Sequence, residues 1–311
     1  MKKYLSKKVV MAAVLGLTFF GGVCVENAVH AEGANTSVAV NVQVQQDAKG
    51  GVDWTKGANS DVTAVGVGLP PENMGTRGTP LARRAAIVDA QRNLAEMIKG
   101  VQIDSDTLMQ DLVIKSDTVS AKVSALVNGY RIVDEGLNPD GSYFVKLSVP
   151  MFGMSNSVAA IAIPEIPKPA APEPMPKVDE KKTELPKEEV KQMKTAAFTG
   201  VIVDASGMGL EATFSPVIYD TNGRGIYGMK NIDPDYAISK GMVEYSVNRE
   251  KAIANSRAGA SPLVVKAVSV KGGKNSANKV NVVVSAADGD RILLANESSD
   301  MLKNCAVVFV K

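Results

Sequence analysis

The clearest periodicity of hydrophobic and polar positions runs through residues 81–99, LARRAAIVDAQRNLAEMIK. Projected at about 100° per residue, its apolar side chains share one arc of about 120°, which predicts an amphipathic helix. The arc holds Ala86, Ile87, Ala90, Leu94, Met97 and Ile98, with Arg83 at its start. The opposite side holds Asp89, Arg92, Asn93 and Glu96. Arg92 and Glu96 are four residues apart, a spacing that favours a weak ion pair.

A strand with a nearly bare face is predicted just before this helix. In residues 62–68, VTAVGVG, alternate positions from Val62 to Gly68 form one face that holds an alanine and two glycines. Such a face lets another element approach closely, so we expect Ala86 and Ala90 of the helix to lie on it. Thr79 is the expected N-cap of the helix and Gly100 its terminator.

The rest of the first half continues as a helix and a hairpin. In residues 117–129, Val119, Val123, Leu126 and Val127 share one helical face, and Gly129 ends it. Residues 130–151 predict two strands joined by an Asn-Pro-Asp-Gly turn at positions 138–141.

Residues 164–186, between the two segments with regular hydrophobic patterns, contain many prolines and are otherwise rich in Lys, Glu and Ala. We therefore expect an extended linker there. Beyond it, we expect a strand at 198–205, a hairpin with an Asn222-Gly223 turn, helices at 235–247 and 248–257, strands at 262–270 and 279–285, a helix capped by Ser285 and a closing strand from Cys305.

These patterns predict an α+β protein of two small domains, with helices packed on short, mostly antiparallel sheets and a Pro-rich linker between them. The expected divisions are a signal peptide (1–31), a flexible leader or edge strand (32–52), an N-terminal domain (53–160), a Pro/Lys/Glu-rich linker (161–194) and a C-terminal domain (195–311).

Residues 1–31 have the features of a secretory signal peptide. Lysines near the start precede an apolar run at 9–25, and Val29-His30-Ala31 suits cleavage after Ala31. A retained anchor helix is the alternative, although this run is shorter than the ~20 residues of a membrane span. Lipidation of Cys24 is another, although Val23 is a poor residue to precede a lipidated cysteine.

Cleavage at this point changes which functions the composition allows. It changes the formal charge from +2 to −1, because four lysines and Glu26 are lost, so no nucleic-acid partner is implied. It also removes His30, the only histidine, and leaves Cys305 as the single thiol. Histidine-dependent triads and most zinc sites are thereby excluded, which leaves carboxylate, lysine or tyrosine chemistry, or calcium on oxygen ligands.

Several residues are candidates for a site. Arg83 and Arg84 lie at the start of the long helix, where they could bind an anion or contact a partner. The alternative is a structural role, in which the aliphatic part of the Arg83 side chain packs on the core. Gly66-x-Gly68 lacks the third glycine of a dinucleotide fingerprint. Asp220-x-Asn222-Gly223 starts like a calcium loop but fits a hairpin turn better, and nothing in the sequence brings Asp204 and Asp220 together. Cys305 is expected to be buried.

The first half also resembles a known family. Trp54 with TAVGVGLPP, RRAAIVDAQRNLAEMIKGVQIDSDT and VNGYRIVDEGLNPDGSYFVKLSVPM resemble the twenty-kilodalton outer-membrane lipoprotein family, which is similar to the N-terminal domain of flagellar assembly protein T. The resemblance covers about residues 53–153, and the second half, with TGVIVDASGMG and SPVIYD, resembles the C-terminal part of longer members. It implies an envelope protein without known catalysis. The chain departs from the family in lacking a convincing lipidation cysteine.

We therefore expect an exported, non-enzymatic assembly module of the bacterial envelope, in the periplasm or at the outer membrane, with a flagellar association as one form of this role. The expected partners are envelope proteins and further copies of the chain, and peripheral membrane association is allowed. Arg83, Arg84, Arg92 and Glu96 are the candidate contacts, and no metal or cofactor is expected. The alternatives are a binding protein for a small anion or cell-wall polymer and, third, an enzyme that uses carboxylates.

Overall fold

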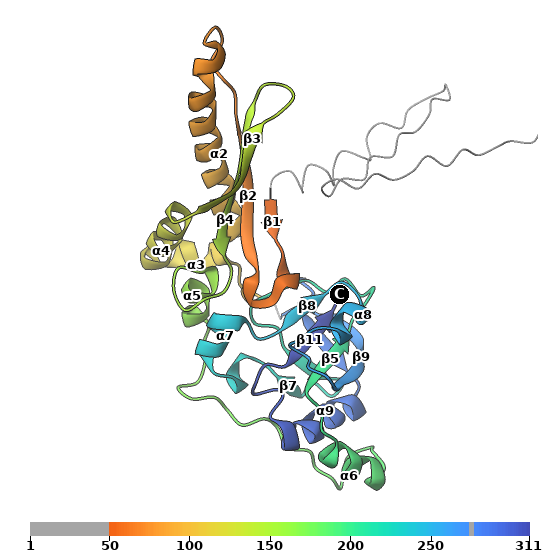
Figure 1. Ribbon diagram of the computed structural model, residues 1–311. Coiled ribbons are helices and arrows are strands. Elements are labelled where there is room, and N and C mark those ends of the chain that lie inside the picture. The colour runs from red at the N-terminus through yellow and green to blue at the C-terminus, as the bar shows by residue number, and fades with distance from the viewer. Residues whose placement is uncertain (1–49, 274–276) are drawn as a thin grey trace, which may run out of the picture. The chain divides into compact units, whose positions relative to one another are not determined.

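The computed structural model describes residues 50–273 and 277–311 (Figure 1). The predicted signal peptide, the cleavage site at Ala31, Cys24 and residues 32–49 of the predicted leader lie outside these ranges. Within the described residues, no helix combines the length and the apolar character that a membrane crossing requires.

An antiparallel four-stranded sheet organises the N-terminal region. Its strands are β1 (Gly50–Val52), β2 (Asp61–Gly68), β3 (Arg131–Leu137) and β4 (Tyr143–Pro150), in the order β1-β2-β4-β3. A short 3₁₀ helix, η1 (Trp54–Asn59), joins β1 to β2. The predicted turn connects β3 and β4, where the Gly141 N–H donates to the Asn138 carbonyl at 3.0 Å.

The helix α2 (Thr79–Lys99) packs against one face of this sheet, as the periodicity predicts (Figure 1). Its fully buried residues recur every four positions: Ala82, Ala86, Ala90, Leu94 and Ile98. The predicted contact with the glycine face of β2 is confirmed, because a methyl group added at Gly66 would overlap the backbone of Ala86 and Ala90.

The start of α2 differs from the expectation. Thr79 is already helical, with φ −57° and ψ −45°, and Gly78 takes the N-cap position without a side-chain cap. The 3₁₀ turn η2 (Gly75–Gly78) runs directly into the helix and causes this difference, because Thr79 is no longer free to take the extended conformation of a capping residue. The end at Gly100 is as predicted.

Helices α3 (Met109–Lys115), α4 (Asp117–Asn128) and α5 (Val158–Ala162) complete the N-terminal region, followed by η3 (Ile163–Glu165). The buried residues of α4 are the four predicted, Val119, Val123, Leu126 and Val127. Val145, Leu147 and Val149 of β4 are fully buried beneath the helices.

The C-terminal region is built on a seven-stranded mixed sheet. Its strands are β5 (Gly200–Asp204), β6 (Ile218–Asp220), β7 (Gly225–Tyr227), β8 (Glu244–Ser246), β9 (Pro262–Lys271), β10 (Asn281–Val284) and β11 (Val307–Val310). The order is β7-β6-β10-β9-β5-β11-β8. Pairs β6–β10, β9–β5, β5–β11 and β11–β8 are parallel. The α+β class is confirmed, but this sheet is less antiparallel than expected, since residue patterns do not show which distant strands pair.

Helices α7 (Pro234–Lys240), α8 (Arg249–Ile253) and α9 (Ala286–Ser299) accompany this sheet, with η4 (Met229–Asn231) before α7. Ser285 caps α9 as predicted, its hydroxyl accepting from the Asp288 N–H at 3.0 Å. The helix expected at 235–247 stops early, because Gly241 adopts φ +78°, and the residues that follow form β8.

The segment expected to be an extended linker is partly folded. Residues 187–195 form helix α6 (Lys187–Thr195), whose Val190 and Met193 pack with Leu185 against Leu294 of α9. Residues 167–174 are exposed, but the Glu173 N–H donates to the Lys230 carbonyl at 2.7 Å. The expectation of an extended linker over 161–194 is therefore wrong at both ends: Ile161, Ile163 and Ile166 are buried in the main core, and α6 packs against α9. The domain boundaries themselves stay a prediction.

The two regions share one hydrophobic core at an aromatic cluster. Trp54 makes edge-on contacts with Phe152, Phe214 and Tyr245, at ring-centroid distances of 6.4, 5.4 and 5.9 Å. Backbone hydrogen bonds reinforce the contact, since Phe214 N–H donates to the Gln102 carbonyl at 3.2 Å. Buried residues of both sheets belong to the same continuous cluster. Residues 53–160 and 195–311 are thus packed together rather than joined only by a tether.

Candidate functional site

The exposed side of α2 carries three of the four predicted contact residues. Arg84, Arg92 and Glu96 are all exposed. The expected ion pair between Arg92 and Glu96 does not form in the described structure. These side chains are therefore available to a partner, and their role as contacts stays a prediction.

Arg83 lies apart from the other three. Its guanidinium makes a two-point ion pair with Glu135 of β3, with Nε–Oε2 at 2.6 Å and Nη2–Oε1 at 3.1 Å. This hydrogen-bonded carboxylate raises the pKa of Arg83 above its ordinary value. Because Glu135 already neutralises the charge, the start of α2 offers less attraction to a free anion than the sequence suggests.

Two polar residues of α2 have a role that the sequence pattern missed. Asn93 Nδ2 donates to the Val65 carbonyl at 2.7 Å, and Asp89 Oδ2 accepts from the Val67 N–H at 3.0 Å. The described part of β1 pairs with β2 only as far as Ala64, so this stretch of the β2 edge has no strand partner among the described residues. Asp89 and Asn93, four residues apart, therefore satisfy the backbone groups of an otherwise open edge. The helical projection placed both on the solvent side, and only their amide and carboxylate chemistry hints at such a role.

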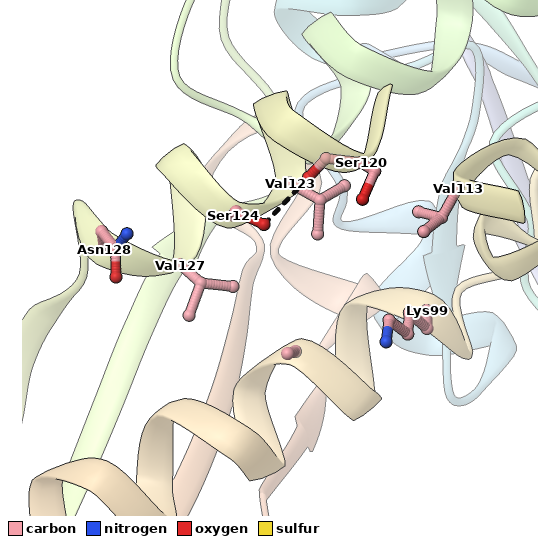
Figure 2. Close-up of a pocket in the computed structure, with 8 residues that line it drawn as sticks. Lys99, Val113, Ser120, Val123, Ser124, Val127 and Asn128 are labelled. Carbon is pink, nitrogen blue, oxygen red and sulfur yellow. Dashed lines mark hydrogen bonds between the residues drawn. The ribbon is translucent and has the colours of Figure 1, made fainter. Parts of the chain in front are cut away.

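A shallow groove lies between α2, α3 and α4 (Figure 2). It has a volume of about 260 Å³, with Val113, Val123 and Val127 on its walls. Lys99 and Asn128 lie at its rim, and the Ser124 hydroxyl donates to the Ser120 carbonyl at 3.0 Å. Among the described residues, Lys99 is the only ionisable side chain that lines it, so the groove does not bring an acid and a base together.

A charged cluster joins the β6–β7 turn to α9. Arg224 donates from Nε to Asp220 Oδ2 at 2.9 Å and from Nη2 to Asp290 Oδ1 at 2.6 Å. Thr183, from the segment before α6, donates to the other oxygen of Asp290 at 2.5 Å. Asp220 Oδ1 also accepts from the Asn222 and Arg224 N–H groups. Asp220 thus holds the turn and Arg224 joins the turn to α9, which supports the hairpin interpretation over a calcium loop.

The remaining candidates are also structural. Asp204 ends β5 and Asp220 ends β6, and β9 and β10 lie between these strands, so the two carboxylates do not form a pair. Gly66 and Gly68 face the backbone of α2 rather than a phosphate-binding turn. Cys305 is fully buried, and burial raises the pKa of its thiol. Within the described part of the chain, no group of three or more His, Cys, Asp or Glu side chains is arranged to hold a metal ion.

Comparison with protein-family models gives two matches, one for each region. Residues 53–149 match the model of the LPP20 lipoprotein family, which confirms the resemblance to a lipoprotein family but not the further similarity to flagellar assembly protein T. No curated protein matches the chain. Residues 200–311 match the model of the second domain of Treponema pallidum Tp0624. The four-stranded sheet with α2 is therefore similar to LPP20 lipoproteins, and the seven-stranded sheet with α9 to that second domain.

Proposed function

We propose that this protein is an exported, non-enzymatic assembly module of the bacterial cell envelope that acts through protein–protein contacts. The observation that carries the proposal is the match of residues 53–149 to the LPP20 lipoproteins, together with the signal-peptide features of residues 1–31. The ion pairs of two candidate residues support the proposal, because Arg83 is bound to Glu135 and Asp220 is bound to Arg224.

The exposed side of α2 is the proposed contact surface. Arg84 and Glu96 lie on it without an ion-pair partner in the described structure, whereas Asp89 and Asn93 on its flank are committed to β2. A contact that uses Arg84 or Glu96 would therefore form without breaking an interaction inside the fold.

Cross-linking of intact cells followed by affinity capture of this chain tests the proposal. We expect a high-mass adduct that contains other envelope proteins, and Arg84→Glu or Glu96→Lys should weaken it without unfolding the chain. Glu211→Lys, an exposed position on another loop, is the matched control and should leave the adduct unchanged. A chain that stays uncross-linked while the purified protein hydrolyses an envelope substrate would overturn the proposal.

Two more specific proposals extend this one: attachment of the chain to the membrane by a lipid, and association of the chain with the flagellum. Mass measurement of the exported chain separates a start at Glu32 from a lipid-modified start at Cys24, which is the form that the lipoprotein match favours. Recovery of the chain with purified flagellar basal bodies would support the flagellar form. Its recovery only in other envelope fractions would limit the role to the envelope in general.

A further inference from the structure

Strand β3 is an edge strand that is exposed on both faces. It ends the four-stranded sheet, and in the described structure no strand pairs with its outer edge. Ile132, Val133 and Leu137 have exposed fractions of 38, 50 and 60%. Strand β2, on the other side of β4, has part of its outer edge covered by Asp89 and Asn93, whereas nothing comparable covers β3 among the residues described. An uncovered edge with apolar side chains is a template for pairing with another strand.

The register of β3 places two opposite charges on the same face. Arg131 lies opposite Ser148 of β4, and Asp134 lies opposite Lys146. Ser148 and Lys146 are two residues apart on a strand, so they share a face, and Arg131 and Asp134 share it with them.

A β-bulge makes this arrangement possible. The register shifts between Ile132 and Asp134, which leaves Val133 as the extra residue on β3. In a regular strand, residues three positions apart point to opposite faces. The extra residue of the bulge shifts the alternation by one position, so Arg131 and Asp134 lie on the same face of the sheet, the face away from α2. Between them, Ile132 and Val133 are the two apolar residues of the stretch.

We propose that a second copy of this chain docks on β3 by antiparallel edge pairing about a two-fold axis. The axis passes between Ile132 and Val133, so that Arg131 of each copy lies opposite Asp134 of the other and the apolar residues meet at the centre. A two-fold axis perpendicular to the sheet keeps each residue on its own face, as the charge pairing requires. The stretch is complementary to itself and not to an arbitrary strand, which identifies the occupant as a second copy.

This dimer rests on the proposed function, since it names one contact of an assembly module. In the single chain, Arg131 Nη2 also contacts Asp61 at 3.1–3.2 Å, with an exposed fraction of 63% for the Arg131 side chain. A guanidinium has further donors that can reach a second carboxylate, so the contact with Asp61 can persist in the dimer.

Sedimentation of the exported full-length chain and its charge variants tests the proposal. Arg131→Asp places two acids opposite each other and Asp134→Arg places two arginines opposite each other, so each variant alone should weaken dimerisation by about tenfold or more. A mixture of the two variants restores both ion pairs, and it should form a heterodimer about as tight as the wild-type dimer. Glu211→Arg, an exposed charge reversal elsewhere, should dimerise like the wild type.

The mixture guards against misfolding, because two misfolded variants do not rescue each other. A wild-type chain that stays monomeric at every soluble concentration, or a mixture that gains nothing over its components, would overturn the dimer. Protection from hydrogen exchange, in a monomer, of the β3 amides that point away from β4 would also overturn it and would show that another part of the chain covers the edge. If the envelope adduct persists while the dimer fails, the proposed function stands without this contact.

Discussion

Gly66 of β2 lies in direct backbone contact with Ala90 of α2, and a Cβ atom at Gly66 would lie only 2.7 Å from the Ala90 Cα. The same added atom would overlap the Ala86 carbonyl oxygen and the Ala90 nitrogen. Neither backbone can move aside without separating the helix from the sheet. This close approach explains why the longest helix of the described chain is rich in alanine on its buried face.

The first prediction follows from that contact. Gly66→Ala should lower the free energy of unfolding by ~1–3 kcal/mol, the usual effect of overpacking, because the strand and the helix must separate. Gly51→Ala is the matched control, since no atom lies within 4 Å of the added methyl group there and the residue is also in a strand. Urea unfolding followed by circular dichroism measures both. Equal stabilities of the two variants would contradict the close contact.

Substitutions along α2 give the second prediction. Ala90→Leu should destabilise the protein by ~1–3 kcal/mol, because Ala90 is fully buried against β2. Ala95→Leu should cost much less, because Ala95 is only partly buried and lines the groove beside α4, where a larger side chain has room. The difference in thermal unfolding between the two variants is the readout, and equal effects would show that the helix packs in another orientation.

Local patterns predicted these contacts because the necessary information lies within a few residues. The alternation of Val62 to Gly68, the periodicity of α2 and the Asn-Pro-Asp-Gly turn each specify their own geometry. The role of Asp89 and Asn93 was not predictable, because it depends on how α2 lies along the edge of β2. The parallel pairing of β5 with β11 joins residues about a hundred positions apart. Arg83 was placed near the core from its angle on the helix, but its partner Glu135 comes from a distant strand.

The third prediction concerns the segment before α6. A protease site inserted into residues 167–174, which are exposed, should be cut rapidly in the native chain. The two fragments should nevertheless co-purify, because Trp54 packs with Phe214 and Tyr245 of the other fragment. Trp54→Ala should weaken this association, since loss of a large aromatic side chain from a core costs ~3–5 kcal/mol. Wild-type fragments that separate on gel filtration would show that the two regions are joined only by the tether.

The covered edge of β2 leads to the fourth prediction. Replacement of both Asp89 and Asn93 by alanine should lower stability by ~1–3 kcal/mol, because two hydrogen bonds to the strand backbone are lost. The freed edge should also increase aggregation, which light scattering detects on heating. Arg92→Ala, between them in sequence but exposed, is the control and should change neither property. A double variant as soluble and stable as the wild type would show that the two side chains do not protect the edge.

The fifth prediction uses the titration of Asp204. The Ser206 hydroxyl, which donates to Asp204 Oδ1 at 2.5 Å, is the main cause that lowers the pKa of this carboxyl below 3.8, and the charges of Arg249 and Lys266 add to it. A carboxyl with a depressed pKa in the folded state stabilises the fold above its unfolded pKa, and this contribution is lost as the pH falls through the folded value. Asp204→Asn should therefore be less stable than the wild type near neutral pH, and the difference should shrink once the pH falls below about 3.8. Ser206→Ala should reduce the wild-type dependence, because its hydroxyl is the largest source of the shift. Urea unfolding at several pH values provides the measurement, and a stability difference that stays constant down to the lowest pH would contradict the assigned titration.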